Sequence, residues 1–328
     1  MKAVFKTFFS IVILLSVSTL LFAQTDEKQK EKKRYEHFKE RDISKTYPAS
    51  GNTLNIDNSF GAVKINVWTK NEIKVDIHIE SSSTDKNYAE TTFERIEVTD
   101  KQEGKDIRFK TTMKDNKEKI SCKNCKSTMS IDYTVYIPSS NALNIKNSFG
   151  SIDIPDYAGP VSLTSMYGSL TAGKLDKLGK LDVKFGSANL KYLSNSNVTF
   201  GYSSITIGNL SGSNKIKMEF CGYSKINLDN SLSSLSLDES YSQVHLQPPA
   251  NFSASYDIST SYGSFTDKTN ADIKRTDTPD RYGGDFKKHY EGKSGSGNAK
   301  IVIKSSFGNI MIGEGDKEDM KPKKRVKS

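Results

Sequence analysis

Apolar and polar residues alternate with a period of two in short segments along most of the chain, and each segment follows an aromatic residue. Glycine or serine comes directly after the aromatic residue, and apolar residues stand three and five positions after it in all but one case. Such alternation, rich in β-branched residues, predicts a strand with one buried face. We place nine copies of this pattern, whose aromatic residues are Phe60, Phe149, Tyr167, Phe185, Tyr202, Tyr223, Tyr241, Tyr262 and Phe307.

The spacing of these copies predicts the architecture. From Phe149 to Tyr262 the steps are 18, 18, 17, 21, 18 and 21 residues by subtraction of the residue numbers. A second alternating segment precedes many of the aromatic residues, as at Leu143 and Ile145. Units this small bury their apolar faces only by stacking on one another. We therefore predict an all-β protein, a parallel β-solenoid with two short strands per coil of about 18–21 residues.

Two segments interrupt the repeat within the predicted solenoid, which spans residues 47–314. Residues 73–140 contain alternating stretches separated by turn signals, which indicate an inserted antiparallel β region near the N-terminus. Such a region would cap the open strand edges of the first coils. Residues 267–298 are polar and rich in glycine, lysine and aspartate, and we expect them to form a long loop before the closing coil.

The two ends of the chain have different compositions. Residues 1–23 combine Lys2 and Lys6 with an apolar run that ends at Ala23, which is typical of a cleaved signal peptide. The alternative is an uncleaved anchor, for which the run is short. Residues 24–46 mix both charges and are interpreted as a charged linker, and residues 315–328 as a basic disordered tail. The net charge of +9 is otherwise diffuse.

Three cysteines offer limited chemistry. Cys122 and Cys125 are separated by two residues, and no second such pair or neighbouring histidine pair completes a zinc site. Because disulfides persist outside the cytoplasm, the pair favours a small structural disulfide, with free thiols or a redox role as alternatives. Cys221 lies inside a repeat and is expected to be a buried small residue.

Several stretches resemble a known family. Residues 54–61 (LNIDNSFG), 64–68 (KINVW), 71–75 (NEIKV), 297–301 (GNAKI) and 305–310 (SSFGNI) resemble the exported "putative adhesin" β-solenoid family of unknown function, which is common in Bacteroidota. The resemblance covers roughly residues 45–313. It implies the fold and a cell-envelope setting. The family has no established catalytic residues, so the resemblance implies no active site.

The outward positions of the repeated strand are where we look for a binding site. They carry hydroxyl and amide side chains, which hydrogen-bond sugars and protein backbones. The alternative is that these side chains only solvate a strand face. The aromatic column has two interpretations, internal stacking or an exposed strip for a partner. The candidate ligand face consists of Ser169, Thr171, Ser187, Asn189, Ser204, Thr206, Asn227 and His245.

These observations favour a binding or scaffold protein over an enzyme. Glycoside hydrolysis needs two carboxylates at a set separation, and the outward positions offer only Asp153. We expect no cofactor, no metal and no nucleic-acid partner. The predicted function is a non-catalytic, monomeric, adhesin-like or scaffold protein of the periplasm or cell surface, whose partner is a glycan or an envelope or host protein. The alternatives are a carbohydrate-active β-helix enzyme and a periplasmic envelope-stress sensor.

Overall fold

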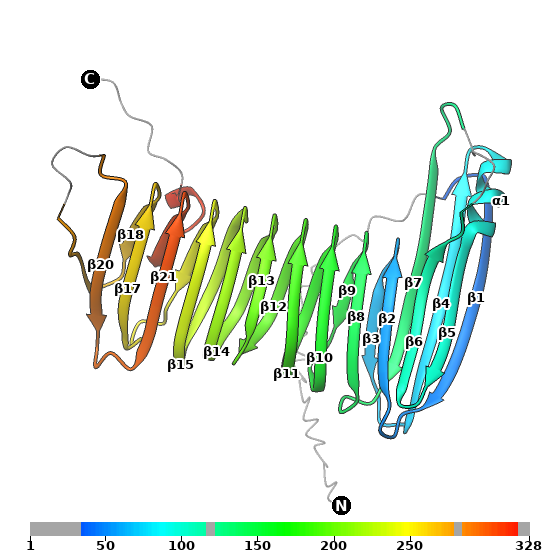
Figure 1. Ribbon diagram of the computed structural model, residues 1–328, viewed down its shortest axis with the longest axis horizontal. Coiled ribbons are helices and arrows are strands. Elements are labelled where there is room, and N and C mark those ends of the chain that lie inside the picture. The colour runs from blue at the N-terminus through cyan, green and yellow to red at the C-terminus, as the bar shows by residue number, and fades with distance from the viewer. Residues whose placement is uncertain (1–33, 116–121, 279–283, 321–328) are drawn as a thin grey trace, which may run out of the picture. The chain divides into compact units, whose positions relative to one another are not determined.

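The computed structural model describes residues 34–115, 122–278 and 284–320. The predicted all-β class is confirmed, because strands make up most of this part of the chain (Figure 1). The exceptions are helix α1 (Lys86–Arg95) and the 3₁₀ turn η1 (Glu318–Met320). In the described ranges, no helix has the length and apolar character needed to span a membrane. The predicted signal peptide, residues 1–23, and the last eight residues of the predicted tail lie outside the described residues.

Strand pairing produces two faces, joined at corners that carry the repeated aromatic residues. In the parallel part of the stack, the strands of the face that we call the leading face run toward these corners, and those of the trailing face run away from them. The antiparallel end strands are assigned to the face whose strands they pair with. Strands β11, β14 and β15 contribute to both faces, since each turns a second corner within its length. One layer consists of a leading strand, its corner and the trailing strand that follows.

The leading face, which is turned toward the viewer in Figure 1, runs in the spatial order β5 (Ile96–Glu103), β6 (Asp106–Met113), β2 (Thr53–Ser59), β8 (Ala142–Ser148), β10 (Tyr157–Met166), β11 (Ser169–Lys184), β13 (Asn197–Gly201), β14 (Ser204–Glu219), β15 (Tyr223–Ser240), β21 (Ala299–Ser306), β17 (Ala254–Ser261), β20 (Lys287–Ser294) and β19 (Asp272–Arg275).

The trailing face runs in the order β1 (His37–Pro48), β4 (Glu72–Ser83), β7 (Ser127–Ile137), β3 (Val63–Val67), β9 (Ile152–Ile154), β11, β12 (Ser187–Ser194), β14, β15, β16 (Gln243–Gln247), β22 (Asn309–Gly313) and β18 (Ser264–Lys268). Pairing is parallel from β7 to β18 on this face and from β6 to β17 on the other. It is antiparallel only among the end strands.

The core lies between the two faces and follows from the period-two pattern. Ile205 and Ile207 of β14 are at most 1% exposed, and their partners in the parallel register, Ala188 and Leu190 of β12, are at most 2% exposed. The same inward positions are apolar in layer after layer, so the buried residues form one continuous cluster. Each fully buried aliphatic side chain contributes roughly 1.5–3 kcal/mol.

The corner residues adopt a conformation that L-amino acids rarely populate. Nine of them have φ between 51° and 66°, in the left-handed region. Their rings stack on one another with centroids 4.8–5.2 Å apart. The predicted copy at Tyr223 is wrong, because the ring in this layer belongs to Phe220. One additional residue separates Phe220 from its trailing strand, so Cys221 takes the position of the small residue and Tyr223 lies within β15.

The closing layer also enters at an unexpected place. Strand β21 lies between β15 and β17, although β17 precedes it in the chain by 38 residues, from Ser261 to Ala299 by subtraction. The ring order is consequently Tyr241, Phe307, Tyr262 and then Phe286, a residue outside the repeat pattern.

Two segments expected to lack regular structure form strands instead. Residues 37–46 of the predicted linker belong to β1, which continues to Pro48 and pairs antiparallel with β4 along its whole length. Part of the predicted polar loop forms β19 and β20, which pair with each other and close the leading face. These strands lie at the ends of the stack, where one side faces solvent, so a charged sequence is compatible with strand pairing. Helix α1 lies within the predicted insertion and was not expected.

The small residue after each ring is required where adjacent layers approach most closely. A Cβ added at Gly168 would lie 1.9 Å from the Gly150 carbonyl oxygen, whereas one added at Gly201 would meet its nearest neighbour at 3.6 Å. The corner backbones also hydrogen-bond between layers, as from the Ser187 N–H to the Gly168 oxygen at 3.1 Å. A side chain at position 168 would therefore clash with backbone atoms, and these atoms cannot move without breaking the hydrogen bonds between layers.

We predict that Gly168→Ala destabilises the protein by about 3 kcal/mol, the upper end of the cost of overpacking. The control Gly201→Ala is expected to be neutral or slightly stabilising, because it reduces the entropy of the unfolded chain without a clash. Urea unfolding of both variants and the wild type measures the difference. Equal midpoints for the two variants would contradict the prediction.

One ionisable side chain is enclosed in the core beside a corner. Glu239 is 1% exposed, accepts a hydrogen bond from the Ser305 hydroxyl and accepts another from the Ser242 N–H at 3.1 Å. Burial raises the pKa of this carboxyl from 4.5 to about 7. The folded state therefore binds a proton more tightly than the unfolded state, and stability falls as the pH rises from about 4.5 to about 7.

Substitution Glu239→Gln should remove this contribution. We expect wild type to lose about 3 kcal/mol relative to the variant between pH 4.5 and pH 8, given 1.36 kcal/mol per pKa unit. Unfolding free energies of both proteins at several pH values test this, because the other carboxyls titrate in both. A variant with the same pH dependence as wild type would show that Glu239 is not the responsible group.

Candidate functional site

Six of the eight predicted ligand-face residues lie together on the trailing face. The register of β11, β12 and β14 aligns Ser169, Ser187 and Ser204 in one row. The same register aligns a second row two positions further along each strand. All six side chains are exposed, because their neighbours in sequence point into the core. The second row consists of Thr171, Asn189 and Thr206.

This arrangement gives the face a regular chemistry. Strands in a sheet lie about 4.8 Å apart, so hydroxyl and amide groups repeat at that interval across three layers. Each group can donate and accept hydrogen bonds. The six side chains include neither a carboxylate nor an imidazole. The face is thus equipped to hydrogen-bond an extended polar partner and lacks its own acid–base groups.

His245 does not belong to this face, contrary to the sequence-based expectation. Its side chain is fully buried, with Nδ1 2.9 Å from the Tyr223 hydroxyl and Nε2 2.7 Å from the Gly313 carbonyl oxygen. Its neighbour in the register, Met311, is buried on the same side of the sheet. The last residue of β22, Gly313, supplies one of these partners. His245 is covered by residues about 70 positions away in the chain, and a local sequence pattern cannot reveal such contacts.

Asn227 is also less accessible than expected. Its side chain is half-buried, and its Nδ2 donates a hydrogen bond to the Gly208 carbonyl oxygen at 3.2 Å, in the neighbouring layer. The amide is therefore committed to holding adjacent layers together. The polar face is limited to the three layers of β11, β12 and β14.

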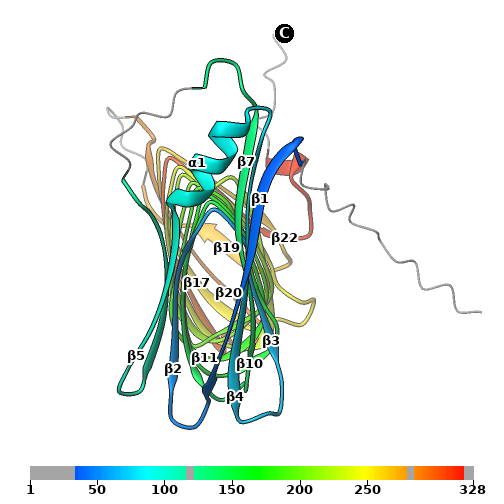
Figure 2. The same ribbon diagram turned by 90° about the vertical axis from the view of Figure 1, so that its right-hand side faces the viewer.

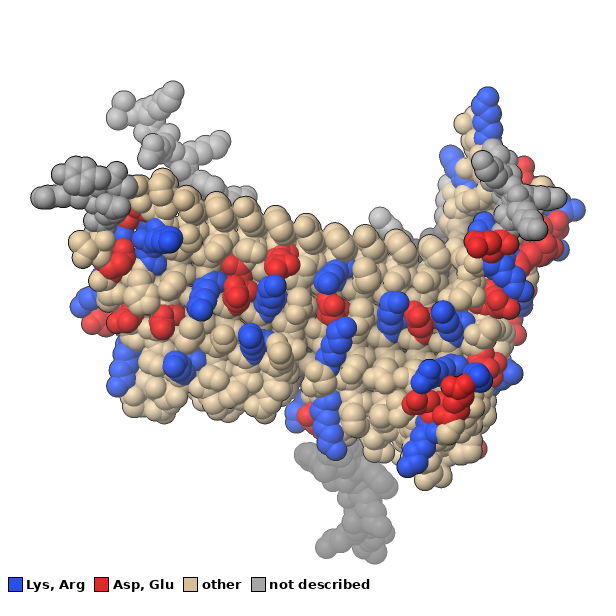
Figure 3. All heavy atoms as spheres, viewed as in Figure 1, with Lys and Arg blue, Asp and Glu red and all other residues tan. Residues whose placement is uncertain are grey.

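The exposed edge of the aromatic column is a second surface, and the sequence did not decide whether it would be accessible. Nine successive rings are 40–55% exposed, and together we call them the ridge. The ridge corresponds to the upper margin of the leading face in Figure 3, where charged side chains are sparse. Both earlier interpretations hold in part, because the rings stack and are also accessible. In spatial order the ridge consists of Phe149, Tyr167, Phe185, Tyr202, Phe220, Tyr241, Phe307, Tyr262 and Phe286.

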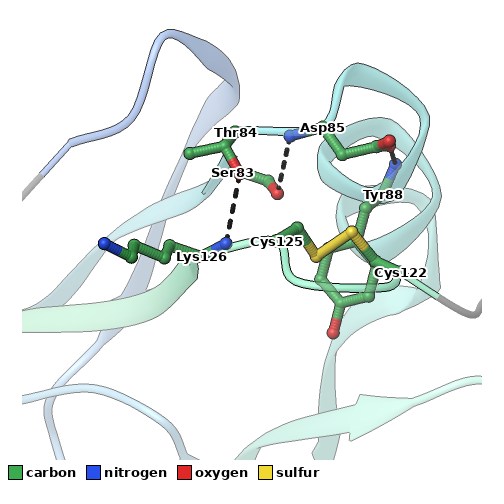
Figure 4. Close-up of a disulfide and its surroundings, with 7 residues drawn as sticks. All are labelled: Ser83, Thr84, Asp85, Tyr88, Cys122, Cys125 and Lys126. Atoms are coloured by element: carbon green, nitrogen blue, oxygen red, sulfur yellow. Dashed lines mark hydrogen bonds between the residues drawn. A yellow bond between two sulfur atoms is a disulfide. The ribbon is translucent and has the colours of Figure 1, made fainter.

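The predicted disulfide between Cys122 and Cys125 is confirmed (Figure 4). The segment that follows it is held to the start of α1, because the Thr84 N–H donates to the Lys126 carbonyl and the Lys126 N–H donates to the Thr84 hydroxyl. Asp85 caps the same helix by accepting from the Tyr88 N–H at 2.8 Å. These contacts hold the disulfide segment beside the capped start of α1.

Cys221 is buried, as expected for a small core residue. Burial raises the pKa of its thiol, which disfavours the reactive thiolate.

One group of side chains on the end strands has the composition of a metal site. Glu40, His78 and Glu80 bring potential ligand atoms within 4.8 Å of one another. The Arg34 guanidinium, however, pairs with both carboxylates, at 3.2 Å from Glu80. A cationic side chain already pairs with both carboxylates, and we assign no metal to the group.

Comparison with known proteins identifies similar structures but no family assignment. No family model and no curated protein matches the chain. Three solved structures are similar at 11% identity. A "putative cell adhesion protein" from Clostridium sporogenes covers 84% of this chain and 100% of its own, with a TM-score of 0.22. A "putative adhesin" from Bacteroides fragilis covers 83% and 97%, with a TM-score of 0.33.

The third, a "putative lipid binding protein" from Parabacteroides distasonis, covers 85% of this chain and 98% of its own, with a TM-score of 0.33.

Proposed function

We propose that this protein is an exported, non-catalytic cell-envelope β-solenoid that acts as an adhesin-like or scaffold protein. Parallel pairing between equivalent strands of successive layers supports the solenoid assignment. Partner residues there differ by 18 positions from Ser169 to Ser187 and by 17 from Ser187 to Ser204, by subtraction. A stack of this kind extends by adding layers, and its faces are long and regular.

The observation that carries the proposal is the two-row polar face. Its six exposed hydroxyl and amide groups lie on rigid strands, so binding a partner costs little ordering of the protein. Repeated donors and acceptors match partners that repeat their own polar groups, such as glycans or extended polypeptides. The absence of a carboxylate among the six residues supports binding rather than glycoside hydrolysis, which requires two.

The first test concerns location. We expect protease and antibodies to reach the protein on intact cells that produce it, and its mature N-terminus to be Gln24. Protection until the cells are lysed would place it in the periplasm and direct the search toward envelope partners. Retention in the cytoplasm with an intact N-terminus would contradict export.

The second test concerns the face itself. In a screen of immobilised glycans and matrix proteins, Asn189→Ala with Thr206→Ala is expected to weaken binding about tenfold or more, through the loss of two hydrogen-bonding groups. The matched control is Asn197→Ala with Thr199→Ala, the same residue types on β13 of the leading face. Equal loss in both double variants would show that binding does not use the trailing face.

A further inference from the structure

The ridge is larger than the apolar patches that monomeric proteins usually expose. A Phe or Tyr side chain has roughly 150–250 Å² of surface, so nine half-exposed rings present on the order of 900 Å². The largest patch on a typical monomer is about 300–600 Å². A stable protein interface buries about 800 Å² on each partner. The ridge alone therefore has the area of one side of a specific interface.

The ring geometry restricts what the ridge can bind. Each internal ring is stacked between two neighbours, with interplanar angles of 1–21° along the ridge. The ring faces are occupied, and only the edges and the tyrosine hydroxyls remain accessible. Stacking on a sugar requires a free ring face, so the ridge does not fit a carbohydrate in the usual way.

A flat membrane also fits poorly. Helix α1 and the adjoining ends of β4 and β7 stand above the line of the ridge at its N-terminal end (Figures 1 and 2). The residues around the start of α1, from Thr84 to Asn87, are polar or charged and exposed. A bilayer that touched the whole ridge would have to admit these groups, at a high cost in desolvation.

A shelf of small residues runs beside the ridge on the trailing face. The residue after each ring is glycine, serine or cysteine, except at Phe286, which Lys287 follows, and the next is serine or glycine in four central layers. The shelf in these layers consists of Gly168 with Ser169, Gly186 with Ser187, Ser203 with Ser204, and Cys221 with Gly222. Large rings beside small residues make a step in the surface, and both parts of the step repeat once per layer.

A surface with a ridge and an adjacent shelf of the same repeat is complementary to itself. The ring centroids along the ridge are 4.8 or 4.9 Å apart, which is the spacing of strands in a β-sheet. The layers of a second copy of this chain therefore repeat at the same interval. Two copies related by a two-fold axis can place each ridge on the other's shelf in register along the whole contact. An antiparallel arrangement also separates the two α1 helices, which a parallel one would bring together.

Tyrosine and phenylalanine alternate strictly along the ridge from Phe149 to Phe286, although they do not alternate in sequence order. Each tyrosine hydroxyl consequently has no hydroxyl neighbour in the adjacent rings. It is available to donate to an oxygen outside the column. In the paired arrangement, the exposed hydroxyls of Ser169, Ser187 and Ser204 on the partner's shelf would accept these bonds.

We propose that the ridge and its shelf form an isologous interface through which two copies of this chain associate antiparallel. The proposal concerns self-association and does not require that the polar face binds a glycan. Because the shelf includes Ser169, Ser187 and Ser204, the first row of the polar face, a second copy and a glycan would compete for that row. It differs from the monomer expected from the sequence, which left open whether the rings stack internally or form an exposed strip.

Sedimentation velocity of the mature protein tests the proposal, and we expect a dimer at micromolar concentration. Ser187→Arg with Ser204→Arg places two charged side chains on the shelf and leaves every ring in place. We expect it to raise the dimer dissociation constant about 100-fold or more, as for loss of a central interface contact. The control Ser236→Arg lies exposed on the leading face and should remain dimeric with the wild-type constant.

A second variant tests the rings themselves. Phe185→Asn, Tyr202→Asn and Phe220→Asn together remove three central rings, and asparagine tolerates the left-handed conformation of these corners. We expect this variant to be monomeric while its far-ultraviolet circular dichroism stays that of a β protein.

A monomeric wild type, or a dimer that persists in the shelf variant, would overturn the proposal. Sedimentation of a monomeric wild type with phosphatidylcholine and phosphatidylglycerol vesicles would overturn it too, and would assign the ridge to a membrane surface.

Discussion

The structure depends on the left-handed corner at which each layer turns from one face to the other. An L-residue in this conformation costs roughly 1–2 kcal/mol, and nine aromatic residues adopt it. Glycine would avoid the cost but would contribute no ring. A stacked aromatic pair returns about 0.5–1.5 kcal/mol beyond the area it buries. The corner is thus unfavourable for one isolated layer and becomes acceptable only when a ring lies on either side.

This dependence explains why the ends of the stack differ from its middle. At the C-terminal end, Phe286 comes from outside the repeat and places a ring on Tyr262, so Tyr262 also has a neighbour on each side. At the other end, Phe60 is only partly exposed, and its backbone oxygen accepts a hydrogen bond from the Ile131 N–H of β7. The antiparallel strands at both ends occupy edges that would otherwise remain unpaired.

The sequence predicts the strands and their inward residues well, because alternation is a local property that each segment carries by itself. It is less reliable about which aromatic residue occupies a corner, as the Phe220 layer shows. Both Phe220 and Tyr223 are aromatic residues followed by a small one, and only the ring above and the ring below decide between them. The buried position of His245 depends on Gly313, and the pairing of β1 depends on β4. Long-range contacts of this kind leave no mark in a local pattern.

The position of the last layer, which contains β21, can be understood from the stacking of the corner rings. Tyr241 and Tyr262 are consecutive corners in the chain and would stack directly if the layers followed sequence order. Two tyrosines at that separation would hold parallel hydroxyl dipoles side by side, too far apart to hydrogen-bond to each other. Insertion of β21 puts Phe307 between them, with centroids 4.8 Å from each ring. The exchange of layer order therefore serves the corner column as well as the core, since it keeps the hydroxyl groups apart and gives both tyrosines an apolar ring to stack on.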